Sequence, residues 1–103
     1  MLEQVQDQHF QPLLGQTATL RLPDGSELPI HIDSLEQKPR SQMPNSERVP
    51  FGVGFNSLEP TDFVDGLCAL ELPGLGPVQD IFVSRVPAMG RDPAVGYFYI
   101  AFN

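Results

Sequence analysis

The chain has 103 residues, of which 41% are hydrophobic and 18% charged, so it has the length of one domain and enough apolar side chains for a core, which excludes disorder throughout. Its 13 carboxylates outnumber its 6 Lys and Arg residues, and the net charge of -7 repels phosphate backbones and anionic lipids. We therefore expect a single domain over residues 1–103 that binds neither nucleic acid nor a membrane.

The N-terminal segment predicts a helix. Its opening, MLEQVQDQHF, lacks the basic and apolar regions of a secretory signal, so we expect a cytoplasmic chain. Pro12 removes a backbone donor and Gly15 closes the segment, so the helix should end within residues 1–14 and cap one open end of the fold. The residues at helical spacing on its inner side are Leu2, Val5, His9, Phe10 and Leu13.

The segment TATLRLPDGSELPIHID alternates apolar and polar side chains on both sides of a Pro-Asp-Gly turn, which predicts a β-hairpin. A two-residue loop would pair residues from opposite faces of the sheet. A three-residue loop with Gly25 in the left-handed conformation keeps the faces together, because it sets Leu20 opposite Leu28. The three-residue loop is therefore favoured, and it brings Arg21 opposite Glu27 on the outer face.

Residues 34–48 follow the hairpin and show no regular period. They hold two prolines and three of the six basic residues of the chain. Because loops of this length in compact domains are either mobile or functional, we predict a long surface loop that could present Lys38 and Arg40 to a partner.

The segment VPFGVGF, residues 49–55, predicts a strand with one large face and one nearly bare face. Glycines at alternate positions weaken a strand, so Gly52 and Gly54 indicate either tight curvature in a small barrel or the close approach of another backbone or a partner. Curvature is the simpler explanation, and the alternative makes both glycines candidate partner contacts.

The segment GLCALELPGLGPVQDIFVSRV, residues 66–86, places a glycine-rich turn between two apolar runs. A phosphate-binding loop needs a helix after its glycines, but the residues that follow are β-branched and aromatic, and Pro77 lacks a backbone donor. We therefore predict a hairpin bend. Its register stays open, because three successive apolar residues occupy both faces of the second strand: Ile81, Phe82 and Val83.

The closing segment GYFYIAFN predicts a strand that is central or covered on both sides, because both of its faces are apolar or aromatic. Eight of the nine aromatic residues lie from Phe51 onward, so the second half of the chain should supply most of the core. A barrel built from it could also enclose a small-molecule pocket, lined by Phe51, Phe55, Phe82 and Tyr99.

The reactive side chains do not predict an enzyme. Cys68 could in principle join His31 and Asp33 in a nucleophilic site, but it shares a strand face with Leu70 and Leu72, which indicates a buried core cysteine. A single cysteine allows no internal disulfide. The sequence shows neither the ligand spacing of a metal site nor a cofactor motif, so we expect no metal and no cofactor.

The chain resembles a family of bacterial domains of about one hundred residues that is classed as a domain of unknown function. The resemblance rests on the PLLG opening, the LPDG turn, the E-x-P-x-x-G bend and the terminal F-N, and it covers nearly the whole chain. Cys68 stands where that pattern often has an aromatic residue, so the thiol is not a family feature. The resemblance implies an accessory or structural role linked to phage-tail-like or collar-type proteins, and it transfers no catalytic residues.

Together these patterns predict an all-β, mainly antiparallel fold. We expect about six strands in a small barrel or strongly curved sheet over residues 16–103, with the N-terminal helix as a cap. The expected function is a non-catalytic interaction or assembly module with a protein partner. The alternatives are a small-molecule-binding barrel and, more remotely, a cysteine-dependent enzyme. The candidate partner surface comprises Gly52, Gly54, Lys38, Arg40 and, on the 87–95 connection, Met89 and Arg91.

Overall fold

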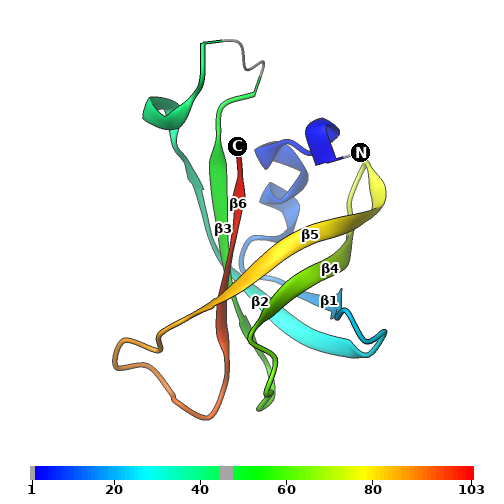
Figure 1. Ribbon diagram of the computed structural model, residues 1–103, viewed down its shortest axis with the longest axis vertical. Helices are drawn as coiled ribbons and strands as arrows, with labels where there is room; N and C mark the ends of the chain where they lie inside the picture. The colour runs from blue at the N-terminus through cyan, green and yellow to red at the C-terminus, as the bar shows by residue number, and fades with distance from the viewer. Residues whose placement is uncertain (1, 45–47) are drawn as a thin grey trace.

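The computed structural model describes residues 2–44 and 48–103, and six antiparallel strands in them close into a barrel in the order β1-β2-β3-β6-β5-β4 (Figure 1). The predicted all-β barrel of about six strands is confirmed. The strands are β1 Thr17–Arg21, β2 Glu27–Gln37, β3 Phe51–Ser57, β4 Asp65–Leu72, β5 Gly76–Val86 and β6 Tyr97–Phe102. The described residues also form four short 3-10 helices: η1 Leu2–Gln4, η2 Asp7–His9, η3 Gln11–Leu13 and η4 Pro39–Ser41.

Side chains that alternate along the strands fill the barrel interior. Phe55 stacks on Phe98 with ring centroids 5.5 Å apart, and Phe51 stacks on Phe102 at 4.8 Å. Phe10 of the N-terminal segment lies 5.6 Å from the Phe102 ring. Burying each such side chain stabilises the fold by roughly 1.5–3 kcal/mol. The largest fully buried side chains are Phe10, Phe51, Phe55, Phe98, Leu20, Ile30, Ile32, Leu72, Ile81, Ile100, Val5 and Val53.

The N-terminal segment covers one end of the barrel, but the continuous helix expected there is replaced by the three short helices η1 to η3. The Gln6 N–H donates to His9 Nδ1 at 2.9 Å, and Pro12 has no N–H to donate. Local three-residue turns therefore replace the longer hydrogen bonds of an α-helix. These turns still point both Val5 and Phe10 into the core, where each is completely buried.

The β1–β2 hairpin has the predicted register. Leu20 lies opposite Leu28, and Arg21 lies opposite Glu27. Gly25 adopts a φ of 88°, the left-handed conformation that the three-residue loop requires.

Strand β2 is longer than predicted, because residues 34–37, which we assigned to the surface loop, continue the strand and pair with β3. A register shift between Ile32 and Ser34 places one extra residue in β2. As a result Leu35 packs against the core although it stands three residues after Ile32. The inward-facing residues therefore do not keep a period of two, and the sequence pattern does not predict this part of the strand. The loop begins only after β2 ends, and its residues 45–47 lie outside the described residues.

The glycine-rich segment between β4 and β5 is the predicted hairpin bend, with Gly74 at a φ of 81°. The register that the sequence left open shifts within this hairpin, and Asp80 adopts a φ of 61° on β5. Strand β5 therefore turns Ile81 and Val83 inward and leaves Phe82 on the outer face, 54% exposed.

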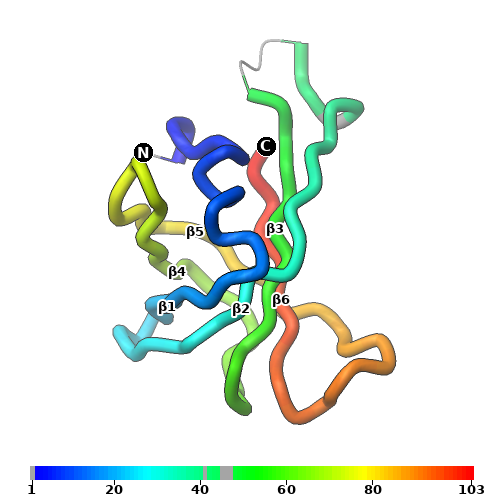
Figure 2. Tube along the Cα trace, turned by 180° about the vertical axis from the view of Figure 1, so that it is seen from behind, coloured from blue at the N-terminus to red at the C-terminus, as the bar shows by residue number. Residues whose placement is uncertain are grey.

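The outer part of the β4–β5 hairpin separates from both neighbouring strands. Strand β5 pairs with β6 only through residues 84–86, and β4 pairs with β1 at only two positions. The N-terminal segment fills the gap between β5 and β6, with η1 lying against β5. Figure 2 shows this segment between the β4–β5 hairpin on one side and strands β3 and β6 on the other.

Arg48 fastens the N-terminal segment to the barrel. Its Nη1 donates to the carbonyl oxygens of Leu2 at 2.8 Å and Val5 at 2.7 Å, while Nε donates to the backbone oxygen of Asn103 at 3.0 Å. Its guanidinium carbon also lies 5.7 Å from the centroid of the Phe102 ring. One side chain therefore joins three segments that are distant in the sequence.

Candidate functional site

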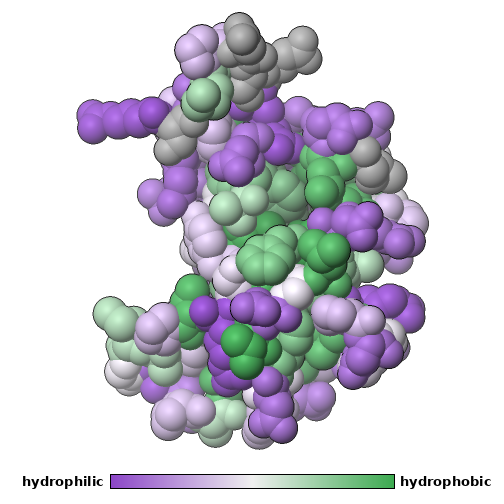
Figure 3. All heavy atoms as spheres, viewed as in Figure 1, coloured by the Kyte–Doolittle hydropathy of each residue, from purple (hydrophilic) through white to green (hydrophobic). Residues whose placement is uncertain are grey.

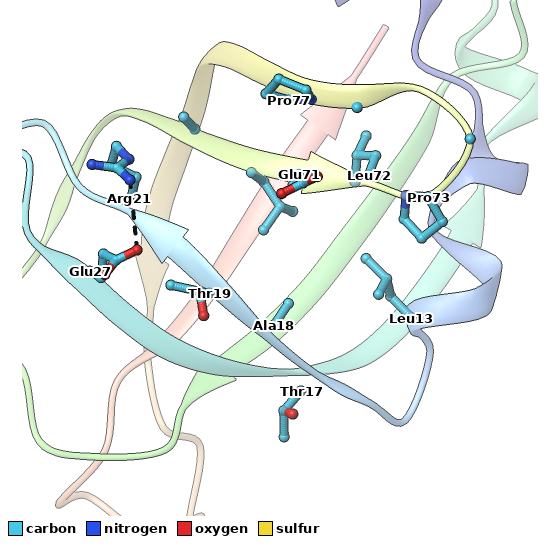
Figure 4. A pocket seen from close by; sticks show the side chains of 14 residues that line it. Leu13, Thr17, Ala18, Thr19, Arg21, Glu27, Glu71, Leu72, Pro73 and Pro77 are labelled. Atoms are coloured by element: carbon cyan, nitrogen blue, oxygen red, sulfur yellow. Dashed lines mark ion pairs between the residues drawn. The ribbon is translucent and has the colours of Figure 1, made fainter.

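The barrel is closed weakly between β1 and β4. These strands pair only where Leu20 lies opposite Leu70 and Arg21 lies opposite Ala69. Strand β1 pairs with β2, by contrast, at all five of its residues. Toward the start of β1 and the end of β4 the two strands lie apart (Figure 4). We call this opening the β1–β4 seam, and define it by residues 17–19 of β1 together with residues 71–72 of β4.

Strand β1 turns unused backbone groups toward the seam. At the hairpin turn, the Leu22 N–H donates to the Ser26 carbonyl oxygen at 2.8 Å. Every second residue of an antiparallel pair bonds across to its partner, so in β1 the even-numbered residues bond to β2. The N–H and C=O groups of Thr17 and Thr19 therefore point toward the seam.

Strand β4 contributes the opposite edge. Because Arg21 bonds toward β4, its partner Ala69 bonds toward β1, and two residues farther on Glu71 has the same orientation. Pro77, which lies opposite Glu71 on β5, has no N–H and cannot complete a hydrogen-bonded pair with it. A non-hydrogen-bonded pair such as Leu20 and Leu70 has a hydrogen bond on either side, so the Glu71 N–H bonds to the Thr19 carbonyl oxygen. Within the described residues the groups without a strand partner are the Thr19 N–H, the Glu71 C=O and both groups of Thr17, and these can pair with an added segment at the open end of the seam.

An open groove of about 680 Å³ lies along the seam. Figure 4 shows Leu13 and Pro73 at its open end, and Arg21 and Glu27 at the end where β1 meets β4. Its floor is apolar: Leu72 is only 1% exposed, while Leu13 is half-buried. The residues that line the groove include Leu13 of η3, Thr17, Ala18 and Thr19 of β1, and Leu70, Glu71 and Leu72 of β4.

The rim of the groove is charged. Arg21 and Glu27 form an ion pair with Nη2 and Oε2 3.7 Å apart, and their side chains are 60% and 61% exposed. Such an exposed pair stabilises the fold by at most about 1 kcal/mol. Glu71 is exposed, and no cation pairs with it in the described part of the chain. The rim therefore carries one uncompensated negative charge.

An apolar surface adjoins the seam on the outer face of β4 and β5. Leu67 and Phe82 lie opposite each other across these strands, and each is 54% exposed. Ala69, which lines the groove, follows Leu67 on the same face. Figure 3 shows green, hydrophobic side chains among purple ones over β4 and β5.

The two glycines predicted as partner contacts lie beneath side chains of the same chain. A Cβ atom at Gly52 would overlap the Tyr99 hydroxyl, and one at Gly54 would lie 2.5 Å from Ser34 Oγ. Both glycines are thus explained by the close approach of another group, as the sequence suggested, but the approaching groups are side chains of this chain and not of a partner. Lys38 covers the same place, with Nζ 5.3 Å from the Tyr99 ring centroid, and a hydrogen bond with Tyr99 raises the pKa of Lys38.

Of the two partner contacts predicted in the 87–95 connection, one side chain extends into solvent and the other does not. Met89 is 83% exposed, whereas Arg91 folds back, with its guanidinium 3.8 Å from the Tyr97 ring centroid and its Nε donating to the Ala88 oxygen at 2.7 Å. Arg40 is exposed in η4. Partner binding by these residues stays a prediction.

The four residues predicted to line a ligand pocket do not meet, so that pocket is a wrong prediction. Phe51 and Phe55 point into the core and are at most 2% exposed. Phe82 lies on the outer face because of the register shift in β5, and Tyr99 lies on the outer face over Gly52. The wall of the barrel separates the two pairs.

Cys68 and His31 lie on opposite sides of the barrel wall. Cys68 is 2% exposed inside the core, as predicted, and this burial raises the pKa of its thiol to about 11. His31 is on the outer face of β2, where its Nδ1 lies 2.7 Å from Asp33 Oδ1. The structure therefore does not assemble the nucleophilic site that these three residues could form on paper.

Sequence reasoning missed the seam. Its edges belong to the first and fourth strands, and no local pattern reports which distant strands pair. One signal was available: Gly15 and the turn at residues 23–25 restrict β1 to five residues, whereas β4 has eight. A strand this short cannot cover a longer neighbour.

The comparisons with known proteins give one match. A family model described as "Domain of unknown function (DUF6916)" matches residues 5–102. Neither a curated protein nor a solved structure matches the chain. Among the residues that the structure describes, no helix has the length and apolar composition needed to cross a membrane.

Proposed function

The chain belongs to the DUF6916 family of domains of unknown function, and from this starting point we propose that it is a non-catalytic interaction module that binds an extended segment of a partner protein at the β1–β4 seam. The observation that carries the proposal is a set of backbone groups without a strand partner beside an apolar groove, namely the Thr19 N–H and both groups of Thr17 on one side and the Glu71 C=O on the other. In strand addition, main-chain hydrogen bonds supply affinity and the pockets for alternate side chains supply specificity.

The other side of the β4–β5 hairpin supports this proposal. There the hairpin separates from β6 in the same way, and a segment of the chain itself occupies the gap. The exposed pair of Leu67 and Phe82 beside the seam would let a bound partner continue across β4 and β5. Within the proposal, the partner belongs to a phage-tail-like or collar-type assembly, which is the setting that the sequence resemblance implies.

Two substitutions at Thr19 test the proposal. Thr19→Pro removes the N–H that points toward the seam and leaves the ladder to β2 intact, whereas Thr19→Val keeps this donor and the shape of the side chain. The tagged wild type and both variants are used to purify bound proteins from an extract of the native source. We expect a stoichiometric partner with the wild type and with Thr19→Val, and its loss with Thr19→Pro.

Circular dichroism of the purified variants provides the folding control. A folded Thr19→Pro variant that retains the partner in full would contradict binding at the seam. Retention of a partner by none of the three proteins would count against the interaction module itself.

A further inference from the structure

We infer that the segment bound at the β1–β4 seam is basic, with small or medium apolar side chains directed into the groove and a Lys or Arg directed outward beside Glu71. The inference rests on the proposed function, because it names the chemistry of the partner at the same site. It follows from the two faces that an added strand would present, since its side chains alternate between the groove and solvent.

The inward face calls for side chains of limited size. Leu70 is 3% exposed and Leu72 is 1% exposed, so the chain already covers the deepest part of the floor. What stays uncovered is the shallower apolar surface of Leu13 and Ala18, which are half-buried and belong to η3 and β1. A valine or alanine fits above them, whereas a large aromatic side chain would push the strand away from the backbone groups of the seam.

The outward face calls for a positive charge. Glu27 already pairs with Arg21 at the closed end of the groove, but Glu71 has no ion-pair partner within the described residues. A residue of the bound segment that lies beside Glu71 would be within the distance at which opposite charges on neighbouring strands attract. The net charge of -7 acts in the same direction, because it raises the rate at which a basic segment arrives.

The same charges argue against a second copy of the chain as the occupant. Two copies that met at this seam would bring two like-charged molecules together, and each would carry its own Glu71. The structure therefore favours a partner of opposite charge over self-association.

Two designed pentapeptides test the inference, acetyl-TVKVT-amide and acetyl-TVEVT-amide, which differ only in the outward central residue. Each is titrated at millimolar concentration into the full-length protein labelled with ¹⁵N, and the amide shifts of Thr17, Thr19 and Glu71 report occupation of the seam. We expect the lysine peptide to bind about two- to fivefold more tightly, the effect of one exposed ion pair. Glu71→Lys should reverse this preference.

Glu59→Lys is the matched control, because it makes the same change of charge at an exposed residue of the loop between β3 and β4. It should leave the preference for the lysine peptide in place. Equal binding of both peptides at the seam, or a preference that survives Glu71→Lys, would overturn the inference and leave the proposed function standing. Seam shifts that grow with protein concentration alone would assign the seam to a second copy, which also overturns the inference. If neither peptide shifts the seam amides, the proposed function fails with it.

Discussion

Replacing Arg48 with methionine should destabilise the domain by about 3 kcal/mol. Its hydrogen bonds to the partly buried carbonyl oxygens of Leu2 and Val5 contribute about 1 kcal/mol each. The two bonds to the exposed Asn103 oxygen contribute about 0.5 kcal/mol each, because water can replace them. Methionine keeps an apolar stem over the neighbouring rings, so Arg48→Met removes these hydrogen bonds and the charge above Phe102 but little of the packing.

Urea unfolding followed by circular dichroism measures this loss, and the midpoint of thermal unfolding should fall by about 12–24 °C in a domain of this size. Arg48→Lys is the control, because lysine keeps the charge but cannot reach three separate oxygens with a planar fork. It should recover less than half of the lost stability. An Arg48→Met variant within about 0.5 kcal/mol of the wild type would refute the view that this side chain holds the N-terminal segment in place.

Three further changes test the packing. Gly52→Ala should lower the free energy of unfolding by about 1–2 kcal/mol in the wild type and by close to nothing in a Tyr99→Ala background. The reason is that the added methyl group competes with the Tyr99 side chain for the same space. Additive effects of the two substitutions in urea unfolding would contradict this overlap. The raised pKa of Cys68, about 11 against an ordinary 9.0, implies a contribution to stability that is complete below about pH 9 and is lost as the pH rises through about 11. It amounts to roughly 2–3 kcal/mol, so the wild type should lose about that much more stability than Cys68→Ala between about pH 8 and pH 12. Equal losses in the two proteins would show that the thiol is not buried. Asp80→Gly should stabilise the domain by about 0.5–1 kcal/mol, because Asp80 has a φ of 61° that glycine adopts without strain, and a lower unfolding midpoint would contradict this expectation.

The parts of the fold that follow from local chemistry could be predicted from the sequence. The β1–β2 register was correct because a three-residue turn at Gly25 leaves only one way to keep Leu20 and Leu28 on the same face. The N-terminal helix was wrong because successive three-residue turns can bury Val5 and Phe10 as well as an α-helix can.

The candidate site could not be predicted, for a physical reason. Whether a backbone group of β1 has a hydrogen-bond partner depends on where β4 lies, and β4 is about fifty residues away along the chain. Thr17 and Thr19 look like ordinary outer-face residues of a hairpin, and Glu71 looks like any exposed carboxylate. Only the register of β1 against β4 shows that their backbone groups face an opening.

Because β6 lies between β3 and β5, the barrel cannot close until Tyr97–Phe102 has left the ribosome. The β1–β2–β3 meander and the β4–β5 hairpin pair locally, but closure of the barrel waits for the non-local pairings of β6 with β3 and of β1 with β4. Such non-local pairings slow folding. Until β6 arrives, β3 exposes unpaired backbone groups beside Phe51 and Phe55, and β5 exposes them at residues 84–86. Such an intermediate is prone to aggregate through these edges, a hazard that pairing with β6 removes.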